Sequence, residues 1–171
     1  AARLFILSDS PPEKDVQWSD EGIISSYKFI QKLWLLNNNI LQEISKDHKN
    51  DASEKLLKFT NQFIKKMTYN LTSFSYNILI ANLHEMYSFL SKEIKNGYSK
   101  KTLEDNYTKI LIMMFPIIPH FALECMEINS FKIEQNWPSY DENLLIEDKI
   151  KLVIQINGKK RALIEVIRDL E

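Results

Sequence analysis

The apolar residues of this chain recur with a helical period over most of its length. Between Ser19 and about Lys46 they fall three or four positions apart for roughly seven turns. Ser19 suits the N-cap of this predicted helix, and Asp20 and Glu21 suit its first turn, where carboxylates are favourable against the helix dipole. We therefore expect a long amphipathic helix here.

Two further long helices follow the same period. One begins at the capping pattern of Asp51 and Glu54 and ends near Thr72. The next begins at Tyr76 and ends at Gly97, a residue that suits the left-handed position after a helix. Both predicted helices have one apolar face, so each must pack against a neighbour.

A fourth long helix is predicted after Gly97. Ser99 or Thr102 caps its beginning, and Pro116 and Pro119 break it or kink it. We expect one further short helix at residues 121–128. Short connections between long helices favour antiparallel neighbours, so we expect an up-and-down bundle of four to five helices.

The period changes to two near the end of the chain. Apolar and polar residues alternate in residues 151–156 and resume in residues 161–166 after Asn157 and Gly158. Asn-Gly between two such runs is typical of a β-hairpin. Because an isolated hairpin is only marginally stable, we expect the missing strands of a truncated α/β domain beyond residue 171. We therefore expect a mainly α fold with a C-terminal hairpin. The chain does not begin with methionine, so we expect it to be a piece of a longer protein.

The composition fits one globular domain and excludes several classes of site. The chain is 44% hydrophobic, with 3 glycines and 5 prolines, and its single cysteine, Cys125, excludes an internal disulfide framework. We find no signal peptide and no membrane-spanning run, so we expect a cytoplasmic protein. The three histidines are far apart, and neither a glycine-rich phosphate loop nor a nucleophile elbow occurs. We therefore predict no catalytic residue, no metal and no cofactor site in this piece.

The charge distribution leaves binding as the remaining role. The net charge is −1, but residues 124–148 contain seven acids and one lysine, whereas residues 149–161 contain five basic residues and no acid. Because the whole chain is nearly neutral, a polyanion would have to bind at local patches of basic residues. Ordinary solubilising lysines are the alternative. The candidate RNA-contacting residues are Arg3, Lys28, Lys32, Lys65, Lys66, Lys159 and Arg161.

Several ordered strings resemble the C-terminal region of bacterial-type leucyl-tRNA synthetases nearly from end to end. They are ARLFIL at 2–7, SPPEKD at 10–15, WSD at 18–20, FIQKLW at 29–34, IKKMT at 64–68, FSYN at 74–77, FPIIPHFALE at 115–124, WP at 137–138 and VIQINGK at 153–159. The strings WSD at 18–20 and QINGK at 155–159 are the ones that point to leucine. Lys32 stands where the family has an arginine. The lysine keeps the positive charge but lacks the planar guanidinium group that can bind a phosphate through two hydrogen bonds.

The resemblance implies a domain order. Residues 1–18 would link the catalytic domain to a helical anticodon-binding domain at 19–148, and residues 149–171 would begin the truncated C-terminal domain. The intact enzyme would be a leucine–tRNA ligase that joins leucine to tRNA(Leu) with ATP and Mg²⁺. Its catalytic motifs would lie upstream. This piece would dock tRNA(Leu) mainly by shape and backbone contacts, as part of a monomer and with the remaining domains in cis.

Two alternatives stay open on the sequence alone. The isoleucyl- and valyl-tRNA synthetases share this kind of bundle. A non-enzymatic helical adaptor that binds other proteins through exposed aromatic residues would also fit the composition.

Overall fold

Helices account for most of the structure, a computed structural model that describes residues 1–9, 11, 13–46, 48, 53–131, 136–145, 149–156 and 158–167. The chain divides into two compact units, Ala1–Tyr140 and Asp141–Glu171. The first contains α1 (Ala2–Asp9), α2 (Asp20–Lys46), α3 (Glu54–Thr72), α4 (Tyr76–Glu93), η1 (Ile94–Asn96), α5 (Lys100–Met114) and α6 (Pro119–Ile128). The second contains η2 (Glu142–Leu145), β1 (Lys149–Ile156) and β2 (Lys159–Ile167). The predicted mainly helical fold with a C-terminal hairpin is confirmed.

Local capping residues set the helix boundaries much as predicted. The Gly22 amide donates to Ser19 Oγ over 3.1 Å at the start of α2. Gly97 has φ of 75° and ends η1, which continues α4. Of the two predicted N-cap residues of α5, Ser99 and Thr102, the structure has Ser99. Its side chain accepts a hydrogen bond from the Thr102 amide over 3.4 Å. The proposed capping residue Asp51 lies outside the described residues, and Ser53 occupies the N-cap of α3.

The first eighteen residues contain a packed helix that the apolar pattern did not indicate. Leu4 and Phe5 of α1 are buried in the helical unit. A Cβ at position 22 would lie 2.4 Å from Phe5 Cε2, so the glycine permits the close approach of α1 to α2. The eight residues of α1 are too few for a helical period to stand out. That this segment links two domains stays a prediction.

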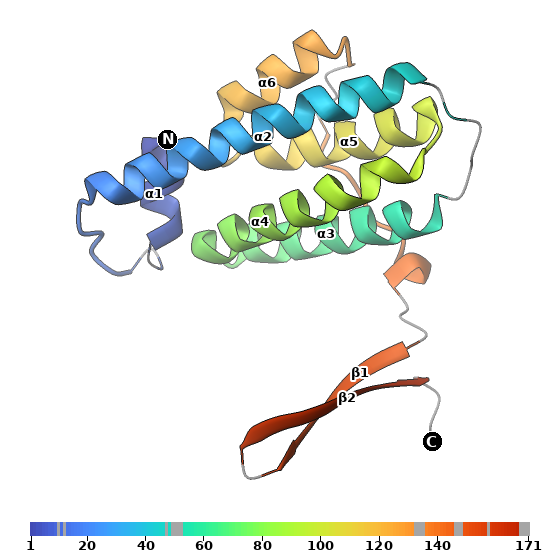
Figure 1. The fold of residues 1–171 in the computed structure, drawn as a ribbon. Coiled ribbons are helices and arrows are strands. Elements are labelled where there is room, and N and C mark those ends of the chain that lie inside the picture. The colour runs from blue at the N-terminus through green and yellow to red at the C-terminus, as the bar shows by residue number, and fades with distance from the viewer. Residues whose placement is uncertain are drawn as a thin grey trace. The chain divides into compact units, whose positions relative to one another are not determined.

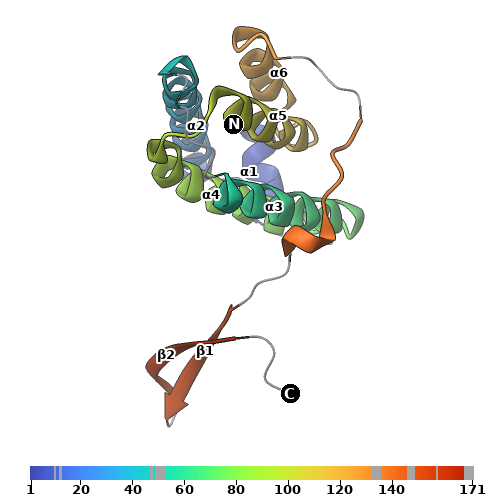
Figure 2. The ribbon, with the colours of Figure 1, turned by 90° about the vertical axis from the view of Figure 1, so that its right-hand side faces the viewer.

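In the helical unit, α4 lies between α2 and α3 (Figures 1 and 2). The helix α5 packs against α2, α3 and α6, and α1 packs against α2 and α4. Every helix of the unit contributes apolar side chains to one core. Its fully buried members include Leu33, Ile40, Phe63, Met67, Leu83, Met86, Leu103, Ile110, Ala122 and Cys125. After α6, Trp137 Nε1 donates to Thr68 Oγ1 over 2.8 Å and joins the following segment to α3.

In the second unit, β1 and β2 form an antiparallel two-stranded sheet. Gly158 has φ of 73°, as the predicted turn requires, whereas Asn157 lies outside the described residues. Leu152, Ile154 and Ile164 are exposed. The hairpin therefore presents uncovered apolar side chains, as expected of a sheet that needs further strands or a surface to cover it.

Candidate nucleic-acid interface

Lysines gather on the two helices that flank α4. Positions 22–42 of α2 and 55–72 of α3 together contain six lysines and no acidic residue. Lys28 and Lys32 lie one turn apart on the exposed face of α2, and Lys65 and Lys66 are exposed on α3. The packing of α4 between these helices brings both predicted lysine pairs to one part of the helical unit.

His84 of α4 lies close to Lys32. Its imidazole stacks on the buried ring of Phe29 of α2, with ring centroids 3.7 Å apart and an interplanar angle of 25°. Burial and the positive charge of Lys32 lower the pKa of His84 below its ordinary value of 6.5. The positive charge of Lys32 on α2 therefore acts on the side chain of His84 on α4.

Lys66 is tied to α4 on the opposite side. Its Nζ donates to both carboxylate oxygens of Glu85, over 2.8 and 2.9 Å. Both side chains are about half exposed, so water screens this pair and its contribution to stability is small. Lys28, Lys32 and Lys65 have no carboxylate partner among the residues that the structure describes.

We call the exposed side chains of α2, α4 and α3 in this region the three-helix face. Its charged and titratable members are Lys28, Lys32, Lys65, Lys66, His84 and Glu85. The sequence analysis identified the four lysines, but it missed His84 and Glu85. Their relevance depends on which helices are neighbours, and the spacing along one helix does not give that information.

Arg3 lies on α1, where it is exposed. It lines a mainly apolar pocket of about 510 Å³ together with Trp34 of α2 and with Phe121 and Glu124 of α6. The rings of Trp34 and Phe121 meet edge to face at 6.2 Å. A carboxylate lines the same pocket, so Arg3 is a weaker phosphate candidate than Lys28, Lys32 and Lys65, which have no carboxylate partner among the described residues.

Lys159 and Arg161 form a separate exposed cluster in the second unit. Lys159 is the first residue of β2 and pairs with Ile156 of β1. The register shifts between Ile154, which pairs with Ala162, and Gln155, which pairs with Lys160, and this shift leaves Arg161 as the extra residue of a β-bulge. Arg161 lies close to the hairpin turn because it follows Gly158 after two residues.

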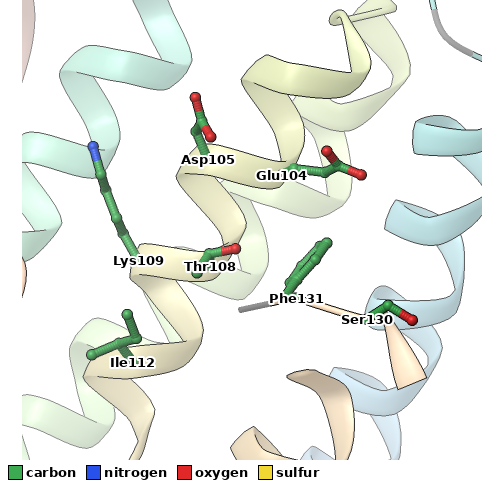
Figure 3. Close-up of a pocket in the computed structure, with 7 residues that line it drawn as sticks. All are labelled: Glu104, Asp105, Thr108, Lys109, Ile112, Ser130 and Phe131. Atoms are coloured by element: carbon green, nitrogen blue, oxygen red, sulfur yellow. The ribbon is translucent and has the colours of Figure 1, made fainter. Parts of the chain in front are cut away.

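A further pocket, of about 450 Å³, lies between α5 and the residues that follow α6 (Figure 3). Figure 3 shows that its charged side chains, Glu104, Asp105 and Lys109, point in different directions rather than toward one centre. With two carboxylates and one ammonium group, this pocket does not favour a phosphate group.

The part of the chain that the structure describes offers neither a metal cluster nor a membrane-spanning helix. Its residues include no group of three histidine, cysteine, aspartate or glutamate side chains that could hold a metal ion. None of its helices is both long and apolar enough to span a membrane.

Comparisons with known proteins agree with this architecture. The family described as the anticodon-binding domain of tRNA ligase matches residues 53–171. Leucine–tRNA ligases of Fusobacterium nucleatum and Orientia tsutsugamushi are 31% and 39% identical over 99% and 98% of this chain. A crystal structure of the Agrobacterium radiobacter K84 agnB2 LeuRS, in a ternary complex with tRNA and LeuAMS, superposes with a TM-score of 0.78 at 20% identity.

The matches cover nearly all of this chain but only part of each relative. The chain covers 21% of the Fusobacterium protein, 20% of the Orientia protein and 23% of the Agrobacterium chain. The Agrobacterium match covers 99% of this chain and shows the shared fold. The chain therefore belongs to the family of anticodon-binding domains of tRNA ligases, and it corresponds to that region of the leucyl-tRNA synthetases.

Proposed function

We propose that the three-helix face docks the phosphate backbone of tRNA(Leu). The observation that carries this proposal is the group of exposed lysines on the three-helix face, of which Lys28, Lys32 and Lys65 have no carboxylate partner among the described residues. Exposed ammonium groups can replace the counterions of RNA phosphates at little desolvation cost. The structural match to a synthetase that was solved in complex with tRNA supports tRNA as the polyanion that binds here.

Within the whole protein, we infer that this region serves a leucine–tRNA ligase. That enzyme would use ATP and Mg²⁺ in the cytoplasm as a monomer, with its other domains in cis. The residues present do not fit Mg²⁺, because the described part of the chain holds no cluster of metal-ligating side chains. The role proposed for this chain is to position tRNA, and we propose that the chemistry belongs to other parts of the enzyme.

The chain is expected to bind tRNA(Leu) weakly and in a strongly salt-dependent way. Three or four phosphate contacts predict a slope of log affinity against log salt of about −2 to −4. Fluorescence anisotropy titrations from about 50 to 200 mM salt would measure this slope. Affinity that does not change with salt would contradict phosphate docking, and the absence of tRNA binding at the lowest salt would remove the proposed function.

Replacement of Lys65 by alanine is expected to weaken tRNA binding and to bring the salt slope about one unit closer to zero, because one phosphate contact is lost. Glu85→Ala should have the opposite effect on affinity, since it removes the carboxylate that engages Lys66. Lys101→Ala, at an exposed position of α5, is the control and should bind like the wild type.

The opposite signs of the Lys65 and Glu85 variants separate docking from loss of structure. A variant that merely loosened the helices would weaken binding in both cases. If both variants bind as the wild type does, the α3 side of the three-helix face does not contact tRNA. Circular dichroism would verify that each variant retains its helices.

A further inference from the structure

Two large aromatic rings are exposed where α3 turns into α4. Tyr69 in the last turn of α3 is 71% exposed, and Phe74 in the following turn is 62% exposed. Most aromatic rings of the helical unit are instead packed against its core. Two such exposed rings, one on each side of the same helix end, call for an account of what they contact.

The backbone holds Phe74 in an unfavourable conformation. Its φ is 55°, in the left-handed region that residues other than glycine, asparagine and aspartate rarely adopt. The turn is fixed by hydrogen bonds from the Ser75 amide to the Asn70 carbonyl over 2.9 Å and from the Ser73 amide to the Tyr69 carbonyl over 3.0 Å. Such strained residues are enriched at functional sites. Here the strain coincides with an outward-facing ring.

The ring of Phe74 is also supported from the side. It meets the ring of Tyr76 edge to face, with centroids 6.1 Å apart and an interplanar angle of 84°. Tyr76 begins α4 and packs against the core. Contact with a residue anchored in this way limits the motion of the Phe74 ring while much of its surface remains exposed.

The electrostatic surroundings favour an anionic partner. Positions 59–84 contain Lys65 and Lys66 and no acidic residue, and Glu85, the next acid, pairs with Lys66 but not with Lys65. Lys65 is four residues before Tyr69 and Lys66 is three before it, so both lysines share a helix surface with that ring. A protein partner that used only apolar contacts would have no need of these cations, whereas RNA presents phosphates beside flat bases.

We propose that Tyr69 and Phe74 form a stacking platform for unpaired bases of the docked RNA, with Lys65 binding the adjoining phosphate. This inference rests on the proposed function and adds a second kind of contact to it. Every base has a π-face, so such a platform accepts different bases without reading their edges. The partner is therefore a loop or another unpaired stretch of tRNA rather than a continuous helix.

The experiment compares two probes of equal charge. One is single-stranded oligouridylate of about 12 nucleotides, and the other is an abasic ribose-phosphate strand of the same length. Anisotropy titrations with the complete chain at low salt should give about tenfold tighter binding of the strand that carries bases. Phosphate docking alone predicts equal affinities.

The variants remove each ring without adding strain. Phe74→Gly suits a positive φ and removes the ring, and Tyr69→Ala acts on an exposed helical position. Each should reduce the preference for bases several-fold, while Tyr69→Phe should retain it. Tyr27→Ala, at an exposed tyrosine of α2, is the matched control and should leave the preference unchanged.

The tRNA titration distinguishes this proposal from phosphate docking. Phe74→Gly should lower tRNA affinity at every salt concentration with the slope unchanged, whereas Lys65→Ala changes the slope. Equal binding of the two strands, or variants that keep the preference for bases, would overturn the stacking platform while leaving phosphate docking intact. Self-association of the chain that depends on Phe74, without any base preference, would also overturn it and would assign this surface to a second copy.

Discussion

Glu93→Ala is expected to lower the free energy of unfolding of the helical unit by about 3 kcal/mol. Glu93 is 4% exposed, yet its carboxylate is hydrogen-bonded on several sides. Tyr98 Oη and Asn96 Nδ2 each donate to Glu93 Oε1 over 2.6 Å, and Lys55 of α3 donates to Oε2. Alanine would leave the buried Tyr98 hydroxyl without its acceptor and would break the link between α3 and the end of α4.

The same carboxylate predicts a loss of stability in acid. Burial raises the pKa of Glu93, but the hydrogen bonds from Lys55, Tyr98 and Asn96 outweigh it, and the pKa lies below its ordinary value of 4.5. A group with a lowered folded-state pKa stabilises the protein fully above the unfolded-state value. This contribution is therefore complete above pH 4.5 and is lost as the pH falls through the folded-state pKa.

Urea denaturation at a series of pH values would measure both effects. Glu93→Gln keeps the shape of the side chain and should be less destabilising than alanine, with a weaker dependence on pH below 4.5. Glu104→Ala removes a partly exposed carboxylate of α5 and should change the stability by less than about 0.5 kcal/mol. An alanine variant of Glu93 no less stable than that control would show that the carboxylate does not hold α3 and α4 together.

Features that depend on a few neighbouring residues could be predicted from the sequence. Ser19 as an N-cap and Gly97 as a left-handed residue follow from local hydrogen bonding and sterics, which are the same in most proteins. The hairpin strands around Gly158 follow from an alternating pattern and a turn residue of suitable conformation. Each of these predictions needed no knowledge of the neighbouring helices.

Features that depend on contacts between helices could not be predicted in this way. The spacing of Lys28 and Lys32 places both on one face of α2, but it does not reveal that His84 of α4 lies beside Lys32. The pairing of Lys66 with Glu85 likewise appears only when α3 and α4 are packed together. The left-handed conformation of Phe74 has no local signal, because glycine and asparagine are the usual residues there.

Asn37→Ala is the second variant with a large expected effect, a loss of about 3 kcal/mol in the free energy of unfolding. Asn37 of α2 is 0% exposed. Its Oδ1 accepts hydrogen bonds from Tyr107 Oη of α5 and from Asn129 Nδ2 after α6, both over 3.1 Å. Burial raises the pKa of Tyr107 well above its ordinary value, so its hydroxyl stays a neutral donor. Alanine would leave the buried Tyr107 hydroxyl and the partly buried Asn129 amide without this acceptor.

The chain offers matched controls for this prediction. Asn38→Ala changes the adjacent, exposed asparagine and should alter the stability by less than about 0.5 kcal/mol. Combining Asn37→Leu with Tyr107→Phe removes a donor and its acceptor together and should cost less than Asn37→Ala, because fewer polar groups are left unpaired. Equal stabilities of the Asn37 and Asn38 alanine variants would contradict the prediction. Because α2 carries Lys28 and Lys32, the alanine variant at Asn37 should also weaken tRNA binding as its helices loosen, an effect that the paired replacement should largely restore.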